Sequence, residues 1–79
     1  MNQQEIETKV KQIIHEQADI SRDEIKLEST LEDLDLDSLG QVELLLGLEE
    51  TFEVDIPDED VESLKTVKDV VDYIAKRLS

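Results

Sequence analysis

The amino-acid sequence predicts an all-α fold: a small four-helix bundle with three main helices, one short helix and a long first connection. Three observations favour it. The chain has 79 residues and no cysteine, so a single domain over residues 1–79 is expected, without disulfides. Its apolar residues recur at helical spacing, and it has only one Phe and one Tyr. The core is therefore expected to consist of aliphatic side chains packed between helices.

The first helix is expected over about residues 3–16. Its apolar residues follow a helical repeat: Ile6, Val10, Ile13 and Ile14.

The connection that follows, about residues 17–37, is long for a small bundle, so we expect it to be fixed to the core or to be functional. Two S-x-x-E patterns in it, Ser21 with Glu24 and Ser29 with Glu32, fit helix capping boxes. Apolar anchors are spaced along it: Ile20, Ile25, Leu27, Leu31, Leu34 and Leu36.

The second helix is expected to begin near Ser38 and to end near Phe52 or Glu53. Pro57 ends any helix before it, because the residue preceding a proline disfavours the helical conformation.

A short acidic turn is expected over residues 58–62, and a last helix starts at Thr66, with Asp69 completing its cap. Lys76 and Arg77 suit the negative end of that helix. Its apolar face is Val67, Val70, Val71, Ile74 and Leu78.

The charge of the chain is strongly negative and unevenly distributed. Twenty-two acidic residues face eight basic ones, for a net charge of −14, and residues 27–64 contain 14 acids and no Lys or Arg. Such a segment repels nucleic acids and anionic membranes and attracts basic protein surfaces. No run of 18 apolar residues and no targeting signal is evident, so we expect a cytoplasmic protein, complete or lacking its targeting segment. We also expect it to be a monomer.

On a helical wheel the second helix has two apolar arcs. One is the expected core stripe: Leu44, Leu45, Leu48 and Phe52. The other mixes aliphatic residues with carboxylates: Leu39, Val42 and Leu46 with Glu43, Glu49, Glu50 and Glu53. An apolar patch ringed by charge is typical of a surface that a partner protein covers. The alternative is that the long connection covers these three aliphatic side chains.

The stretch before this helix has features of a calcium loop. Asp33, Asp35 and Asp37 match positions 1, 3 and 5 of an EF-hand loop. Ser38 stands where that loop needs glycine, and Leu44 where it needs a bidentate Glu. A dedicated calcium site is therefore not favoured, although weak binding of divalent ions to the acids stays open.

Ser38 itself has three other interpretations. A catalytic nucleophile would need a base and an oxyanion hole, and the only histidine, His15, belongs to the first helix. A helix cap fits, since Ser38 and Gln41 form an S-x-x-Q pattern, with Asp37 as a rival cap. An attachment point also fits, because a serine at a helix start is exposed and held at a defined angle.

Several short stretches of the sequence occur together: D-S-L (37–39), V-E-L (42–44), E-E (49–50), F (52), I-P-D-E (56–59) and T-V-x-D-V-V-D-Y-I (66–74). This set resembles the acyl carrier protein family, and the resemblance covers essentially the whole chain. The resemblance implies that Ser38 receives 4′-phosphopantetheine from coenzyme A through a phosphopantetheinyl transferase. It also implies a carrier rather than an enzyme, which holds acyl chains as thioesters and shuttles them among fatty acid synthase enzymes.

The resemblance further implies docking on basic patches of synthase enzymes and acyltransferases. The residues expected to take part are Asp37, Leu39, Val42, Glu43, Leu46, Glu49, Glu50, Glu53 and Ile56. We also expect the aliphatic core to open and hold a fatty chain between the helices.

Three positions depart from the commonest family pattern. Family members often have glycine where Asp35 stands, a small residue where Leu36 stands and an Asp where Gly40 stands. A serine followed by Leu and Gly also occurs in carriers of other pathways, and I-P-D-E argues against the D-alanyl type. A specialised carrier, for polyketides for example, therefore stays open. An alternative of another class is an acidic helical interaction module without a prosthetic group.

Overall fold

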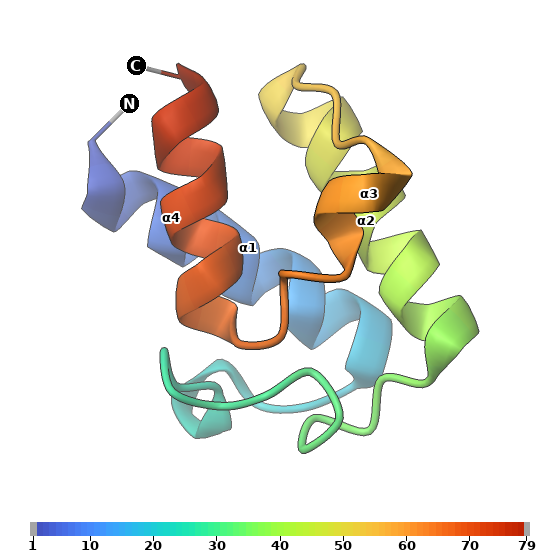
Figure 1. Cartoon of the computed structure of the whole chain (residues 1–79). Coiled ribbons are helices and arrows are strands. Elements are labelled where there is room, and N and C mark those ends of the chain that lie inside the picture. The colour runs from blue at the N-terminus through green and yellow to red at the C-terminus, as the bar shows by residue number, and fades with distance from the viewer. Residues whose placement is uncertain (1, 79) are drawn as a thin grey trace.

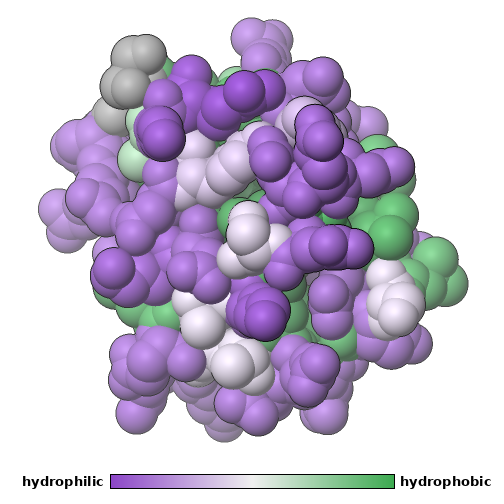
Figure 2. Space-filling model, viewed as in Figure 1, coloured by the Kyte–Doolittle hydropathy of each residue, from purple (hydrophilic) through white to green (hydrophobic). Residues whose placement is uncertain are grey.

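Four α-helices and one 3-10 turn make up the chain in the computed structural model, which describes residues 2–78. Their bounds are α1 (Gln3–Ala18), η1 (Arg22–Glu24), α2 (Ser38–Phe52), α3 (Asp58–Val61) and α4 (Val67–Leu78). Helix α1 packs against both α2 and α4, while the long connection loops across one end of the bundle (Figure 1). The surface in Figure 2 is mainly hydrophilic, with hydrophobic side chains gathered toward the side of α2. The predicted all-α bundle is confirmed.

Helix α1 begins and ends with polar caps. The Asn2 side chain accepts a hydrogen bond from the Glu5 N–H at 2.8 Å. Asp19 adopts the left-handed conformation that ends many helices, with φ of 57°. The helix therefore continues to Ala18, two residues beyond the expected end at residue 16.

The long connection is fixed to the core, as its length predicted. Backbone hydrogen bonds tie it to the start of α4, from the Val67 N–H to the Ser29 carbonyl and from the Lys68 N–H to the Leu27 carbonyl. Four of its predicted anchors are buried and two, Ile20 and Leu27, are half-buried. The buried four are Ile25, Leu31, Leu34 and Leu36.

The two capping boxes predicted in this connection do not form. Ser21 precedes η1 but makes no side-chain cap. The Ser29 hydroxyl accepts from the Lys26 N–H, and the next turn is capped one residue later, where Thr30 Oγ1 accepts from the Asp33 N–H. The predictions were wrong because an S-x-x-E spacing does not show which residue begins a turn.

The cap of α4 forms as predicted. The Asp69 N–H donates to Thr66 Oγ1 at 3.1 Å, and the Thr66 N–H donates to Asp69 Oδ2 at 3.1 Å. The hydrogen bond from the Thr66 N–H holds the pKa of Asp69 below its usual value. Backbone N–H groups at the start of α4 therefore have hydrogen-bond acceptors.

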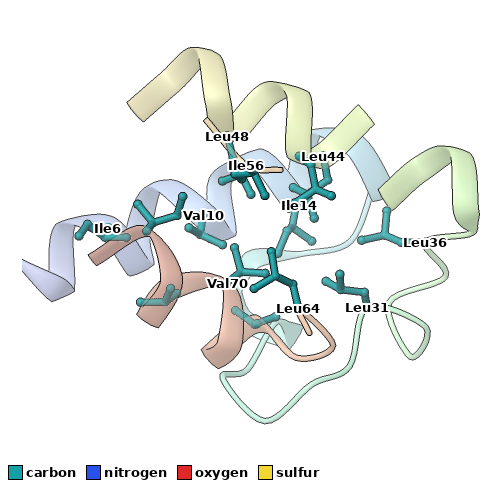
Figure 3. Packing of buried hydrophobic residues seen from close by; sticks show 14 of the residues in the cluster. Ile6, Val10, Ile14, Leu31, Leu36, Leu44, Leu48, Ile56, Leu64 and Val70 are labelled. Carbon is teal, nitrogen blue, oxygen red and sulfur yellow. The ribbon is translucent and has the colours of Figure 1, made fainter. Parts of the chain in front are cut away.

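The core is aliphatic, with Phe52 as its one buried aromatic side chain in the part of the chain that the structure describes. Figure 3 shows how α1, α2 and α4 contribute to it, together with Leu31 and Leu36 from the connection and Ile56 and Leu64 from the segments around α3. No polar or charged side chain is buried among residues 2–78. Apolar burial is therefore the main stabilising term. Over the same residues, no helix is long and apolar enough to cross a membrane.

Candidate functional site

Ser38 is exposed at the first position of α2. Of the two candidate caps, Asp37 is the one that forms, because its Oδ1 accepts from the Gly40 N–H at 2.7 Å. Within residues 2–78 the Ser38 hydroxyl has no hydrogen-bond partner. The serine is therefore not used to stabilise the helix start, and its oxygen is accessible from outside.

The chain around Ser38 is held firmly on both sides. The buried Leu36 side chain precedes it, and the Leu36 N–H donates to the Leu31 carbonyl at 3.1 Å. The Gln41 side-chain amide donates back to the Leu36 carbonyl at 2.9 Å. These contacts place the serine at a fixed point of the surface.

The three departures from the family pattern lie close together, with Asp35 and Leu36 in the loop before Ser38 and Gly40 in the first turn of α2. Asp35 has φ of 60°, the left-handed region in which glycine is favoured and Asp is tolerated better than most residues. A Cβ added at Gly40 would lie 3.3 Å from Cδ2 of Leu36 and 3.2 Å from Oδ1 of Asp37. A side chain at position 40 would thus crowd the large side chain of Leu36, and we call Leu36 and Gly40 one packing unit.

The metal and nucleophile interpretations gain no support. No group of three or more His, Cys, Asp or Glu residues among residues 2–78 is arranged to hold a metal ion. The three aspartates of the EF-hand-like stretch therefore do not converge. His15 Nδ1 lies 2.6 Å from the Ile20 carbonyl, so its ring is engaged where α1 meets the connection.

The second apolar arc of α2 is open to solvent. The exposed fractions are 66% for Leu39, 51% for Val42 and 54% for Leu46. The long connection does not cover them, so that alternative is wrong. Large aliphatic side chains this exposed, side by side on one helix, form an apolar patch of the kind that partners cover.

The predicted docking residues of α2 surround this patch with carboxylates. Glu43, Glu50 and Glu53 are exposed, as is Asp37 before the helix. Glu49 is half-buried, and its Oε2 accepts from the Ile56 N–H at 3.3 Å. We call the set Leu39, Val42, Glu43, Leu46, Glu49, Glu50 and Glu53 the α2 face.

Ile56 differs from the other predicted docking residues. Its side chain is only 6% exposed and belongs to the core. It lines a hollow of about 260 Å³ that also borders Val42, Leu46 and Val61. Ile56 is therefore not on the α2 face itself. It lies at the bottom of a hollow beside that face, because the turn before Pro57 directs its side chain inward.

Two hydrogen bonds between α4 and the segment before it were not predicted from the sequence. The Tyr73 hydroxyl donates to Asp60 Oδ2 at 2.7 Å, and Arg77 Nη2 donates to the Asp55 carbonyl at 2.6 Å. The only signal in the sequence is the i, i+4 spacing of Tyr73 and Arg77, which places both on one side of the helix.

Comparison with known proteins gives a consistent answer. The family model described as "Phosphopantetheine attachment site" matches residues 8–74. An acyl carrier protein of Thermosynechococcus vestitus is 48% identical over 80 residues, which cover 100% of this chain and 99% of the relative. One from Clostridium perfringens is 52% identical over 69 residues, 86% of this chain and 91% of the relative. One from Bdellovibrio bacteriovorus is 49% identical over 73 residues, 91% and 94% of the two chains.

Proposed function

This chain belongs to the acyl carrier protein family, and from that premise we propose that Ser38 is the residue to which its 4′-phosphopantetheine is attached. Members of the family are carriers rather than enzymes, and the group is bound covalently. The observation that carries the proposal is the exposed, unbonded hydroxyl of Ser38 at the start of α2, within D-S-L. Asp37 supplies the cap, so modification of the serine costs the helix no hydrogen bond.

The surroundings of Ser38 fit a covalently attached group. The serine is exposed, and its neighbours on the helix surface, Leu39 and Val42, are exposed as well. A phosphodiester here meets the positive end of α2, a favourable term of about 0.3–1 kcal/mol, which Asp35 and Asp37 oppose. Exposure and rigid placement therefore favour this site more than the helix dipole does.

The chain's own residues also suit thioester chemistry. When bound, the group supplies a thiol that holds an acyl chain as a thioester. The polypeptide has no cysteine, so no second thiol within the chain can exchange with that thioester. The aliphatic core is expected to open and take up part of the chain; shifts of core methyl signals on octanoyl loading would support this, and unchanged signals would contradict it.

The α2 face is the proposed docking surface for the enzymes that load and use the carrier. We propose basic patches on a phosphopantetheinyl transferase, on fatty acid synthase enzymes and on acyltransferases as the partners, because residues 27–64 contain 14 acids and no basic residue. Charge complementarity of this kind speeds encounter and makes binding sensitive to salt. The proposed carrier is a single cytoplasmic domain that acts as a monomer.

A specialised carrier outside the main fatty acid pathway is the second candidate. The exposed, left-handed Asp35 and the missing side chain at Gly40 favour it, because they change the surface around Ser38. Purified loading and condensing enzymes of the fatty acid and polyketide types, offered the same loaded carrier, would separate the two. Faster transfer with one set identifies the pathway.

Mass spectrometry tests the attachment directly. The unmodified chain is incubated with coenzyme A and a phosphopantetheinyl transferase, and should gain the mass of one 4′-phosphopantetheine group. Ser38→Ala should gain nothing. Ser21→Ala is the matched control, since Ser21 is also exposed before a helical turn and makes no side-chain cap. No gain by the natural chain would leave the interaction module as the better interpretation, whereas a gain by Ser38→Ala would mean that the group is attached to another residue.

A further inference from the structure

Helix α3 has few contacts of its own. It has four residues, none of them buried, and the residue before it, Pro57, provides no side-chain cap. Only the residues beside it, Ile56 and Leu64, are buried. Figure 1 shows α3 lying beside α2, on the path of the chain toward α4. A helix this short is not stable by itself, so its position depends on what holds it from outside.

Two side chains of α4 hold this segment. Tyr73 donates to Asp60 within α3 at 2.7 Å, and Arg77 donates to the carbonyl of Asp55 at 2.6 Å. The Arg77 guanidinium also lies 5.7 Å from the centre of the Tyr73 ring, within cation–π range. The hydrogen bond to Asp60, together with burial, raises the pKa of Tyr73, so the hydroxyl remains a donor at neutral pH. We call Tyr73 and Arg77 the α4 clasp.

The seam between α2 and α3 has a hollow on each side of Val61. One, of about 420 Å³, borders Gln41 in the first turn of α2, together with Leu31 and Leu64. The other, of about 260 Å³, borders Leu45 and Ile56. Val61 of α3 lines both. Moving α3 away from α2 would remove this shared wall and join the hollows along a largely aliphatic floor.

We propose that the α4 clasp sets how readily α3 moves away from α2, and thereby how much of an acyl chain carried on Ser38 the fold admits. This inference rests on the proposed function for its ligand, but the clasp itself can be tested on the unmodified protein. The Tyr73 bond ties α3 directly, whereas the Arg77 bond ties only the loop that leads to it. The hydroxyl of Tyr73 is therefore the stronger of the two determinants.

Amide hydrogen exchange tests the clasp without any attached group. The reporters are the N–H groups of Asp60, Ser63 and Leu64, which bond to carbonyls within and just before α3. In Tyr73→Phe and in Asp60→Ala their exchange should rise about two- to tenfold, the effect of losing one hydrogen bond, while the interior of α4 stays unchanged. Arg77→Gln should have a smaller effect.

Lys68→Gln is the matched control on the same helix. It removes the surface pair of Lys68 and Asp72, whose side chains are 64% and 47% exposed and have no hydrogen bond to α3 among residues 2–78. Exchange at the three reporter amides should not change. If Tyr73→Phe raises exchange equally in α1 and α4, Tyr73 stabilises the whole fold and the clasp is refuted. Unchanged exchange at the reporters refutes it as well.

The acyl chain is tested with carriers loaded with octanoyl or acetyl groups. A chain inside the fold is shielded, so the octanoyl thioester of Tyr73→Phe should be cleaved by hydroxylamine several-fold more slowly than that of the natural carrier. The acetyl thioester, which is too short to reach the seam, should be cleaved equally in both. An equal change for the two groups, or none for octanoyl, overturns the proposal. Failure of loading itself would instead contradict attachment at Ser38 and leave the exchange result standing.

Discussion

Helices α2 and α4 each bury one face in the core, but their sequences meet different demands. Helix α4 starts with the reciprocal cap of Thr66 and Asp69 and has Lys76 and Arg77 in its last turn. Its core face is fully buried: Val67, Val70, Val71 and Ile74. Helix α2 has no acidic residue in its first turn, no basic residue in its last turn, and two internal glycines. It also exposes Leu39, Val42 and Leu46.

The difference indicates that the sequence of α4 mainly serves stability, whereas part of the sequence of α2 serves function. Helix α4 follows the local rules that stabilise an isolated helix, whereas α2 breaks several of them, and two of these departures, Gly40 and the lack of an acid in the first turn, lie beside the candidate attachment site. The charge follows the same division. Residues 27–64, which include α2, contain 14 acids and no basic residue, and the other eight acids of the chain are matched by its eight basic residues. The whole net charge of −14 therefore comes from residues 27–64.

The strongest test of this contrast uses two leucines of α2. Leu48 has no exposed surface and Leu46 is 54% exposed. Leu48→Ala should lower the free energy of unfolding by about 2–5 kcal/mol, because it leaves a cavity in the core. Leu46→Ala should change it by less than about 0.5 kcal/mol. Urea denaturation followed by circular dichroism measures both, and a large loss for Leu46→Ala would mean that the α2 face is structural.

Docking should show the opposite ranking. Leu46→Ala should weaken binding to a transferase or synthase enzyme about tenfold, or about 1.4 kcal/mol, because the side chain is expected to lie at the centre of the interface. Calorimetry on the unmodified carrier measures the Kd. Leu78→Ala is the control, since Leu78 is also exposed, at 38%, but lies on α4. Equal losses for the two variants would argue against a docking surface on α2.

The cap of α4 should contribute about 1 kcal/mol, so Thr66→Ala should lower the free energy of unfolding by about that amount. Asp69 adds a pH dependence whose sign follows from its pKa, which the Thr66 N–H lowers in the folded state. Its stabilisation is present above the unfolded pKa of about 3.9 and is lost as the pH falls through the folded value. The stability difference between the natural chain and Asp69→Asn should therefore shrink in acid. The comparison runs from pH 7 down to pH 3, about one unit below the usual Asp pKa. A stability difference that stays constant over this range would show that the carboxylate charge is not involved.

Local sequence patterns predicted most of the fold, because helical repeats, the cap at Thr66 and the stop at Pro57 depend on neighbouring residues. The open α2 face was predicted on the same basis. Contacts between residues far apart in the sequence were not. The inward direction of Ile56 and the bond from Tyr73 to Asp60 depend on how α3 packs, which no local spacing encodes. The left-handed Asp35 was also not predictable from the chain alone, since Asp has no strong signal for that conformation.

The smallest expected effects come from the two glycines of α2. They test whether position 40 has a glycine because of packing inside this chain or because of docking enzymes. An alanine in a helix interior is more stable than glycine by about 0.5–1 kcal/mol. Gly47→Ala should show this gain, because the new Cβ would lie an ordinary 3.4 Å from Ile13. Gly40→Ala should show little gain or a loss, because its Cβ would crowd Leu36 and the capping carboxylate of Asp37.

Thermal unfolding of the two single variants measures this difference, and a second background identifies its cause. In Leu36→Ala, which removes the crowding at Cδ2, the substitution Gly40→Ala should become more favourable than it is in the natural chain. That coupling would mean that the large residue at 36 requires the glycine at 40. If Gly40→Ala and Gly47→Ala stabilise the natural chain equally, packing does not require Gly40. The absence of a side chain at Gly40, close to Ser38, would then have to be explained by the enzymes that dock there.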